Sequence, residues 1–214
     1  MSPRLHLVRH GQGSHELEPL QENQQRPDPV LTDLGVQQCK AFNAAFPEYI
    51  HIDLVCASPM RRAILTAKYC FASALQRTGS ILLLPLAQED SAAPADTGSA
   101  PEVLRAEFGD LVDLSMVKEG WNIKEGVNAP TPQALRERAR KLRHELQLRP
   151  EKEVAVVSHG TFLQYLIGNV DADGQSDEAW THQEWRSYKF VTDDGGEARL
   201  VEEQESVIRR HVLA

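Results

Sequence analysis

Four short apolar runs constrain the fold more than any other feature of this sequence. They cover residues 5–8, 52–57, 81–86 and 153–157, and each has the length of a buried strand. Amphipathic segments with helical spacing lie between them or follow them, at residues 33–46, 60–76, 102–108, 132–148 and 161–167. Strands that alternate with helices predict an α/β fold, a three-layer α/β/α arrangement with a mostly parallel central sheet.

Local signals mark the beginnings of several helices. Thr32 is a good N-cap, and the pairs Ser58–Pro59 and Thr131–Pro132 each combine an N-cap with a proline for the first turn. The helix at 132–148 also carries a run of charges that we interpret as a solvent-exposed face: Arg136, Glu137, Arg138, Arg140, Lys141, Arg143 and Glu145. Near the end, residues 187–192 and 198–203 flank an Asp-Asp-Gly-Gly turn, which predicts a β-hairpin.

The length of 214 residues fits a single domain covering residues 1–214. Within it, residues 91–130 begin with a stretch rich in Ser, Ala, Pro and Gly and continue irregularly, with Trp121 as the expected anchor. We expect this region to form a lid or wall over a site formed by the rest of the domain, because selectivity often resides in such loops.

Charge and cysteine usage narrow the range of partners. The formal net charge of −8 argues against nucleic acid or an anionic membrane as the main partner, but a small anionic substrate needs only a local positive pocket. Cys39, Cys56 and Cys70 form neither a disulfide framework nor a CxxC pattern, which favours a reducing, cytoplasmic setting. The sequence opens with no cationic leader, and its longest apolar run, residues 81–84, is too short to cross a bilayer.

Charged residues follow each of the four predicted strands. They are Arg9 and His10, Arg61 and Arg62, Glu89 and Asp90, and His159. Since parallel strands deliver their carboxyl ends to one edge of the sheet, these side chains should meet there.

Two histidines, at least two arginines and a carboxylate at one sheet edge suit phosphoryl transfer. Arginine can grip phosphoryl oxygens in bidentate fashion, and fixed donors stabilise the charge that spreads over them in the transition state. A neutral imidazole can attack phosphorus and carry the phosphoryl group, while a carboxylic acid protonates the departing oxygen.

The chain resembles the histidine phosphatase superfamily, also called the phosphoglycerate mutase-like family, in its small phosphatase branch. Arg9–His10–Gly11 is similar to the opening signature of that family, and the stretch from Asp28 to Gly35 to its Pro-x-Leu-Thr-x-x-Gly segment. Residues 58–67 resemble its Ser-Pro-Leu-x-Arg-Ala-x-x-Thr-Ala helix start. Glu89 and the triplet at 158–160 complete a set that runs in family order.

The resemblance implies a role for each matching residue. His10 would be the phosphorylated nucleophile, Arg9 and Arg62 would clamp the phosphoryl oxygens, and His159 would donate to the same group. Glu89 would protonate the leaving oxygen and then activate water, with Asp90 as the alternative acid. We expect the substrate to contact Arg9, Arg62, His159, Gly13, Ser14 and Gly160.

The sequence departs from the family pattern after Gly11. An asparagine that helps to hold phosphate is replaced by Glu16, a carboxylate that would repel phosphate unless it is protonated or turned away. We therefore assign Glu16 no phosphate contact, and Gly13 and Ser14 could supply backbone amides or a hydroxyl instead.

The first expectation for the activity is hydrolysis of a phosphate monoester to free phosphate. A mutase-type phosphotransferase and a catalytically silent member that binds phosphorylated ligands are the alternatives. We expect no cofactor and no metal, because the clustered ligands of a metallohydrolase are missing from the sequence pattern. The partner would be a small phosphorylated substrate, whose identity the sequence leaves open together with the oligomeric state.

Overall fold

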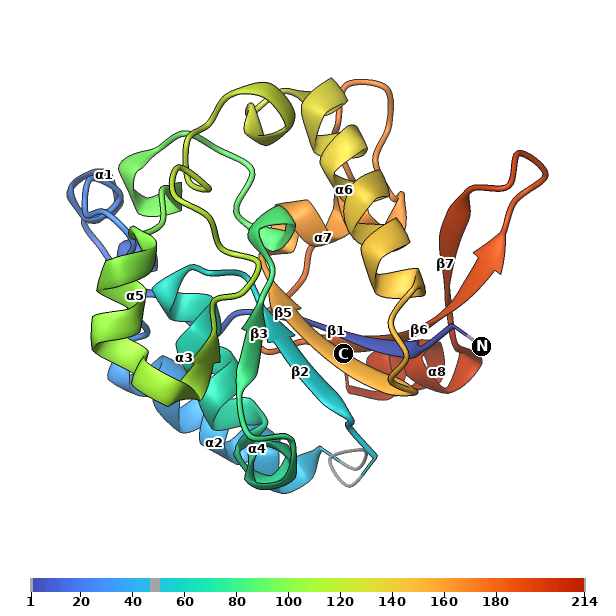
Figure 1. Ribbon diagram of the computed structural model, residues 1–214, viewed down its shortest axis with the longest axis horizontal. Helices are drawn as coiled ribbons and strands as arrows, with labels where there is room; N and C mark the ends of the chain where they lie inside the picture. The colour runs from blue at the N-terminus through green and yellow to red at the C-terminus, as the bar shows by residue number, and fades with distance from the viewer. Residues whose placement is uncertain (1, 47–50, 214) are drawn as a thin grey trace.

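A seven-stranded sheet lies between two layers of helices in the computed structural model, which describes residues 2–46 and 51–213 (Figure 1). The strand order is β4-β3-β2-β5-β1-β6-β7. The first five of these strands are parallel, and β6 and β7 form an antiparallel hairpin on the edge beside β1. The strands are β1 (Arg4–Arg9), β2 (Leu54–Ala57), β3 (Ile81–Leu83), β4 (Val112–Asp113), β5 (Glu153–Ser158), β6 (Trp185–Thr192) and β7 (Ala198–Glu202). The predicted three-layer, mostly parallel α/β fold is confirmed.

Alternating strand residues build a separate core on each face of the sheet. Val55 and Ala57 pack with α2 (Asp33–Ala45), α3 (Arg61–Cys70) and α4 (Ala72–Thr78). Cys56, between them in β2, packs on the other face with α6 (Pro132–Gln147) and α7 (Gly160–Ile167), which Figure 1 shows on the opposite side of the sheet. The remaining helices are α1 (Leu20–Asn23), α5 (Pro101–Phe108) and α8 (Gln204–Leu213), which packs beside β6.

Some predicted elements differ from those observed. The single helix expected at 60–76 is two helices, α3 and α4, because Phe71 leaves the helical conformation. The third strand ends at Leu83 rather than at residue 86, since Pro85 begins a 3-10 turn, η2 (Pro85–Ala87). The sequence reasoning also did not anticipate β4 or α8, which are short or weakly patterned.

The charged run on α6 is not wholly a solvated face. Arg138 is fully buried, its guanidinium lies 4.3 Å from the centre of the Phe162 ring, and it donates hydrogen bonds to backbone carbonyls. Arg143 is also buried and donates to the carbonyls of Ala198 and Leu166. The interpretation of the run as a solvent-exposed face is therefore wrong for these two residues.

The region 91–130 is more ordered than a loop. It contains η3 (Pro94–Asp96), α5, η4 (Gly109–Leu111), β4 and η5 (Gly126–Asn128). Trp121 anchors it as expected: the ring is buried, its Nε1 donates to the Ser99 carbonyl at 3.0 Å, and a Cβ at Gly98 would lie 2.3 Å from the ring. None of the helices described is both long and apolar enough to cross a bilayer.

Candidate active site

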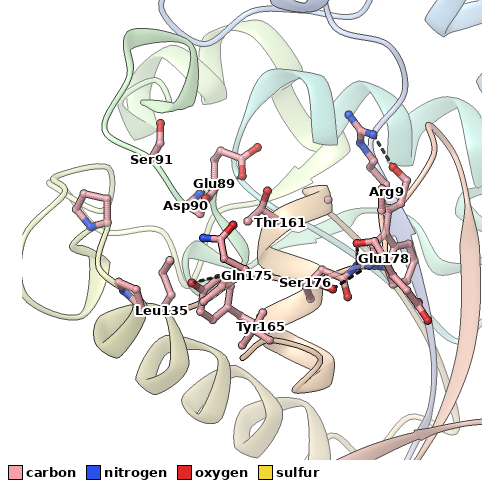
Figure 2. Close-up of a pocket in the computed structure, with 18 of the residues that line it drawn as sticks. Arg9, Glu89, Asp90, Ser91, Leu135, Thr161, Tyr165, Gln175, Ser176 and Glu178 are labelled. Atoms are coloured by element: carbon pink, nitrogen blue, oxygen red, sulfur yellow. Dashed lines mark hydrogen bonds between the residues drawn. The ribbon is translucent and has the colours of Figure 1, made fainter. Parts of the chain in front are cut away.

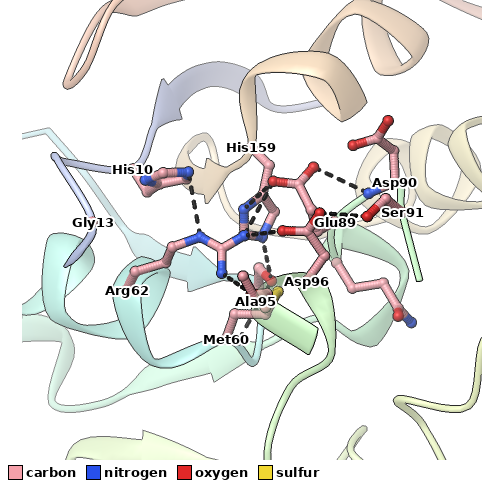
Figure 3. Close-up of polar contacts among 12 residues, drawn as sticks. His10, Gly13, Met60, Arg62, Glu89, Asp90, Ser91, Ala95, Asp96 and His159 are labelled. Atoms are coloured by element: carbon pink, nitrogen blue, oxygen red, sulfur yellow. Dashed lines mark hydrogen bonds and ion pairs between the residues drawn. The ribbon is translucent and has the colours of Figure 1, made fainter. Parts of the chain in front are cut away.

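The carboxyl edge of the sheet brings together the residues that the sequence singled out. His10 follows β1, Glu89 follows β3 after the turn η2, and His159 follows β5. One side-chain atom from each of these three residues lies within 4.8 Å of the others, and all three residues are buried. Figure 3 shows the guanidinium of Arg62, from the first turn of α3, among them.

Hydrogen bonds fix the tautomer of His10. Its Nδ1 lies 2.7 Å from the Gly11 carbonyl, which can only accept, so Nδ1 carries the hydrogen. The Nε2 lone pair is left to accept a long hydrogen bond of 3.4 Å from Nε of Arg62. Burial, and then the positive charge of Arg62, hold the pKa of His10 well below its usual range. The result is a neutral imidazole with an available nucleophilic nitrogen.

Residues of the family-like segments hold the loop that carries His10. Thr66 accepts a hydrogen bond from the Gly11 amide at 2.9 Å and donates to the Arg62 carbonyl at 2.8 Å, which ties the loop to α3. Gly35 allows α2 to approach the same loop, because a Cβ there would lie 2.4 Å from the Gln12 carbonyl oxygen.

Arg62 is fully buried and turned toward the site. Its Nη1 donates to the Ala95 carbonyl at 2.7 Å, and its Nη2 lies 3.1 Å from both a Glu89 oxygen and an Asp96 oxygen. The adjacent Arg61 points outward and pairs with Glu107 at 2.7 Å, so the expectation that both arginines meet the other side chains holds for Arg62 and not for Arg61.

Asp96, from region 91–130, also lies at the site. Its carboxylate contacts Arg62 and accepts a hydrogen bond from the Ser91 hydroxyl at 2.5 Å. Burial, and then the nearby charge of Glu89, raise the pKa of Asp96. No local signal marks such a residue, because its role depends on how region 91–130 folds back onto α3.

Glu89 and His159 lie side by side. Oε2 of Glu89 is 3.2 Å from Nδ1 of His159, and Oε1 accepts a hydrogen bond from the Asp90 amide at 3.0 Å. Burial alone would raise the pKa of Glu89, but His159, a hydrogen bond with Asp90 and the charge of Arg62 outweigh it and hold this pKa well below its usual range. Before a substrate binds, Glu89 is therefore ionised.

Ser58 supports His159 rather than the following helix. Its hydroxyl lies 2.9 Å from Nε2 of His159, whereas α3 begins at Arg61 with Met60 at the cap position. The prediction that Ser58 caps a helix with Pro59 in its first turn is thus wrong. Burial lowers the pKa of His159, and the neighbouring charge of Glu89 opposes this effect.

Arg9 is engaged by Glu16. Its Nη2 donates to Glu16 Oε1 at 2.7 Å, and its Nη1 donates to the Trp180 carbonyl at 2.5 Å. Glu16 also contacts His182 Nε2 at 2.8 Å and accepts from the Gly13 amide at 2.7 Å. Although burial opposes ionisation, these partners lower the pKa of Glu16 to about 2, so it is a carboxylate and not a carboxylic acid. The sequence reasoning missed His182, which is remote in the chain from every motif.

The other predicted substrate-contacting residues have these positions. The Gly13 amide is taken by Glu16, and the Ser14 amide donates to the Val30 carbonyl at 2.9 Å. Gly160 begins α7 directly against Arg9, where a Cβ would lie 3.4 Å from the arginine side chain. His15 lines the cavity with its ring 5.9 Å from that of His10.

The cluster of His10, Glu89 and His159 has donor atoms that could hold a metal ion. The guanidinium of Arg62, however, lies 3.4 Å from the donor atom of His10 and 3.1 Å from that of Glu89. A fixed positive charge among the three donor atoms opposes a cation and suits an anion such as a phosphoryl group.

Comparisons with known proteins find phosphatases. The model of the histidine phosphatase superfamily (branch 1) matches residues 5–203. A Schizosaccharomyces pombe protein described as a probable phosphatase is 30% identical over 166 residues, which cover 75% of each chain.

Two solved structures share the fold. A mycobacterial glucosyl-3-phosphoglycerate phosphatase in complex with VO3 has a TM-score of 0.58 at 19% identity, covering 94% of this chain and 98% of the other. An Entamoeba histolytica phosphoserine phosphatase mutant in complex with phosphoserine has a TM-score of 0.57 at 16% identity, covering 94% and 97%.

Proposed function

The chain belongs to the histidine phosphatase superfamily (branch 1), and from that premise we propose that it hydrolyses a phosphate monoester through a phosphohistidine on His10. The observation that carries the proposal is the neutral, buried His10, whose Nε2 faces the Arg62 guanidinium with Glu89 and His159 within reach. This is the arrangement that an in-line attack on a phosphoryl group requires.

In the first step, Nε2 of His10 attacks phosphorus and the bond from phosphorus to the ester oxygen breaks. Arg62 and His159 donate to the nonbridging oxygens as charge spreads over them. The phosphate dianion draws these donors away from Glu89 and adds negative charge, both of which raise the pKa of Glu89. Glu89 then holds the proton that it gives to the departing alkoxide.

In the second step, water attacks phosphorus of phospho-His10. Glu89, left ionised by the first step, takes the proton of this water, and orthophosphate leaves as the neutral imidazole returns. Glu89 is favoured over Asp90 as the acid because its carboxylate lies beside Arg62 and His159, within 4.8 Å of His10.

The test is hydrolysis of p-nitrophenyl phosphate by the purified chain and its variants. His10→Ala should lower kcat by at least about 10³-fold, because the covalent route is lost. His144→Ala, which changes an exposed histidine on α6, is the matched control and should keep full activity. Hydrolysis that persists in His10→Ala contradicts the mechanism.

Two further measurements separate the alternatives. Glu89→Gln should lower kcat by about 10²- to 10⁴-fold, and a larger loss in Asp90→Asn would instead make Asp90 the acid. Product analysis with a phosphorylated polyol distinguishes the reaction type: inorganic phosphate supports a phosphatase, whereas an isomerised ester without phosphate release supports a mutase. A catalytically silent member would bind phosphate but release none from any ester.

A further inference from the structure

The cavity beside the catalytic cluster is much larger than a phosphoryl group. It measures about 610 Å³, the size of a small-metabolite site, and extends from His10 and Arg9 to the loop after α7. Figure 2 shows Glu89, Asp90 and Ser91 on one side of it and Gln175, Ser176 and Glu178 on the other. With the phosphoryl group held at Arg62 and His159, the alcohol part of a substrate must occupy this space.

Acidic side chains outnumber basic ones in the lining of the cavity. They come from separate segments of the chain, and they are Glu16, Glu89, Asp90, Asp173 and Glu178. Among the lining residues that the structure describes, the guanidinium of Arg9 is the one fixed positive charge. Arg9 already pairs with Glu16, and burial, followed by Arg62, lowers the pKa of His15 to about 4, so that ring is neutral.

The carboxylates differ in how far they are neutralised. Glu178 pairs with Arg186 at 3.0 Å, and Glu89 and Glu16 pair with Arg62 and Arg9. Asp173 is exposed in the loop after α7, and no ion pair involves it within the described part of the chain.

The pKa of Asp90 reflects the acidic groups around it. Burial, and then Glu89 and Asp96, raise its pKa to about 8. A cationic group nearby would lower the pKa of Asp90 again, so that Asp90 becomes a carboxylate and can pair with that group.

We propose that this cavity selects phosphate monoesters whose alcohol part carries a positively charged amine and rejects those that carry a carboxylate. The inference rests on the proposed phosphatase function and names its substrate class. An ammonium group in the cavity would face Asp90 and Asp173. The amide oxygen of Gln175 and the hydroxyl oxygen of Ser176 can accept hydrogen bonds from it. A carboxylate in the same place would be repelled by the acidic side chains of the lining. Arg9 would not offset this repulsion, because it already pairs with Glu16, so the carboxylate ester would bind more weakly.

The test uses three phosphonates of matched length that cannot be hydrolysed: 3-aminopropylphosphonate, 3-hydroxypropylphosphonate and 3-phosphonopropionate. Calorimetry at low salt should rank their affinities in that order, with about a tenfold difference between the amine and the carboxylate. The difference in affinity should shrink at high salt, because Asp173 is exposed and salt screens exposed charges. Equal affinities, or tighter binding of the carboxylate, overturn the proposal.

Variants locate the selectivity. Asp173→Lys should cut the ratio of the amine to the carboxylate affinity by at least about threefold. Asp177→Lys changes the net charge equally, in the same loop but outside the lining of the cavity, and should leave the ratio unchanged. Equal effects of the two variants would mean that overall charge sets the selectivity, which contradicts the proposal.

Turnover is measured separately with p-nitrophenyl phosphate, whose alcohol part carries no charge. Absence of its hydrolysis defeats the proposed function, whereas hydrolysis without selectivity among the phosphonates defeats this inference alone.

Discussion

Replacing Glu16 with glutamine should weaken folding and strengthen phosphate binding at the same time. The carboxylate contacts Arg9 at 2.7 Å, His182 at 2.8 Å and the Gly13 amide at 2.7 Å. A glutamine side chain of the same shape has no charge for these donors. The same substitution removes the ion pair between Glu16 and Arg9. An incoming phosphate then no longer competes with Glu16 for the Arg9 guanidinium.

The pKa of Glu16 gives the size of the stability effect. It falls from 4.5 to about 2 on folding, which corresponds to about 3 kcal/mol of unfolding free energy. Because the folded pKa is the lower one, this contribution is complete above pH 4.5 and is lost as the pH falls toward 2. Glu16→Gln should therefore cost about 2–3 kcal/mol at pH 7. The difference in unfolding free energy between the wild type and Glu16→Gln should be smaller by about 1 kcal/mol at pH 4 and by about 2 kcal/mol at pH 3.

Urea unfolding followed by circular dichroism measures the first effect, and the inhibition constant of inorganic phosphate measures the second. We expect phosphate to bind about fivefold more tightly to Glu16→Gln, because a negative charge beside the site is removed. Glu18→Gln, at an exposed glutamate two residues away, is the control for both measurements. A stability difference that does not change between pH 7 and pH 3, or weaker phosphate binding, would show that Glu16 does not act through its charge.

Three further outcomes follow from the same contacts. Asp96→Asn removes one of the two carboxylates at Nη2 of Arg62, so inorganic phosphate should bind about threefold more tightly, and unchanged or weaker inhibition would contradict this. Arg138→Met removes the donors to the Gln88 and Glu89 carbonyls, so it should lower kcat about 10-fold or more with little change in KM. Arg138→Lys keeps a donor and should recover part of the lost kcat. An equal loss of kcat in both variants would argue against a positioning role for Arg138. Since burial and Arg62 keep His10 neutral, kcat for p-nitrophenyl phosphate should hold from pH 7 down to pH 5.5, and a decline with a midpoint near 6.5 would show that His10 titrates normally.

The sequence was sufficient where short-range physics decides the structure. The strand positions follow from apolar runs, and Thr32 and Thr131 cap their helices as expected, accepting hydrogen bonds from the amides of Gly35 and Ala134. The convergence of His10, Arg62, Glu89 and His159 follows from parallel strands that end at one edge.

The sequence was insufficient where distant segments decide a side chain's environment. Arg138 has the spacing of a solvated helix face, but it is buried and donates to the carbonyls of Gln88 and Glu89, which lie 50 and 49 residues earlier in the chain. Asp96, at the end of the 3-10 turn η3, and His182, in the turn before β6, join the site from short segments for which no periodicity predicts a position. Ser58 likewise bonds to His159, a residue 101 positions away, instead of capping the next helix.

The covalent route through His10 is tested most directly by the stereochemistry at phosphorus. A phosphate monoester made chiral with oxygen isotopes and sulfur is hydrolysed, and the configuration of the product thiophosphate is determined. Two in-line displacements, first by His10 and then by water, should give overall retention of configuration. Inversion would mean that water attacks the substrate directly, and it would contradict the role given to His10.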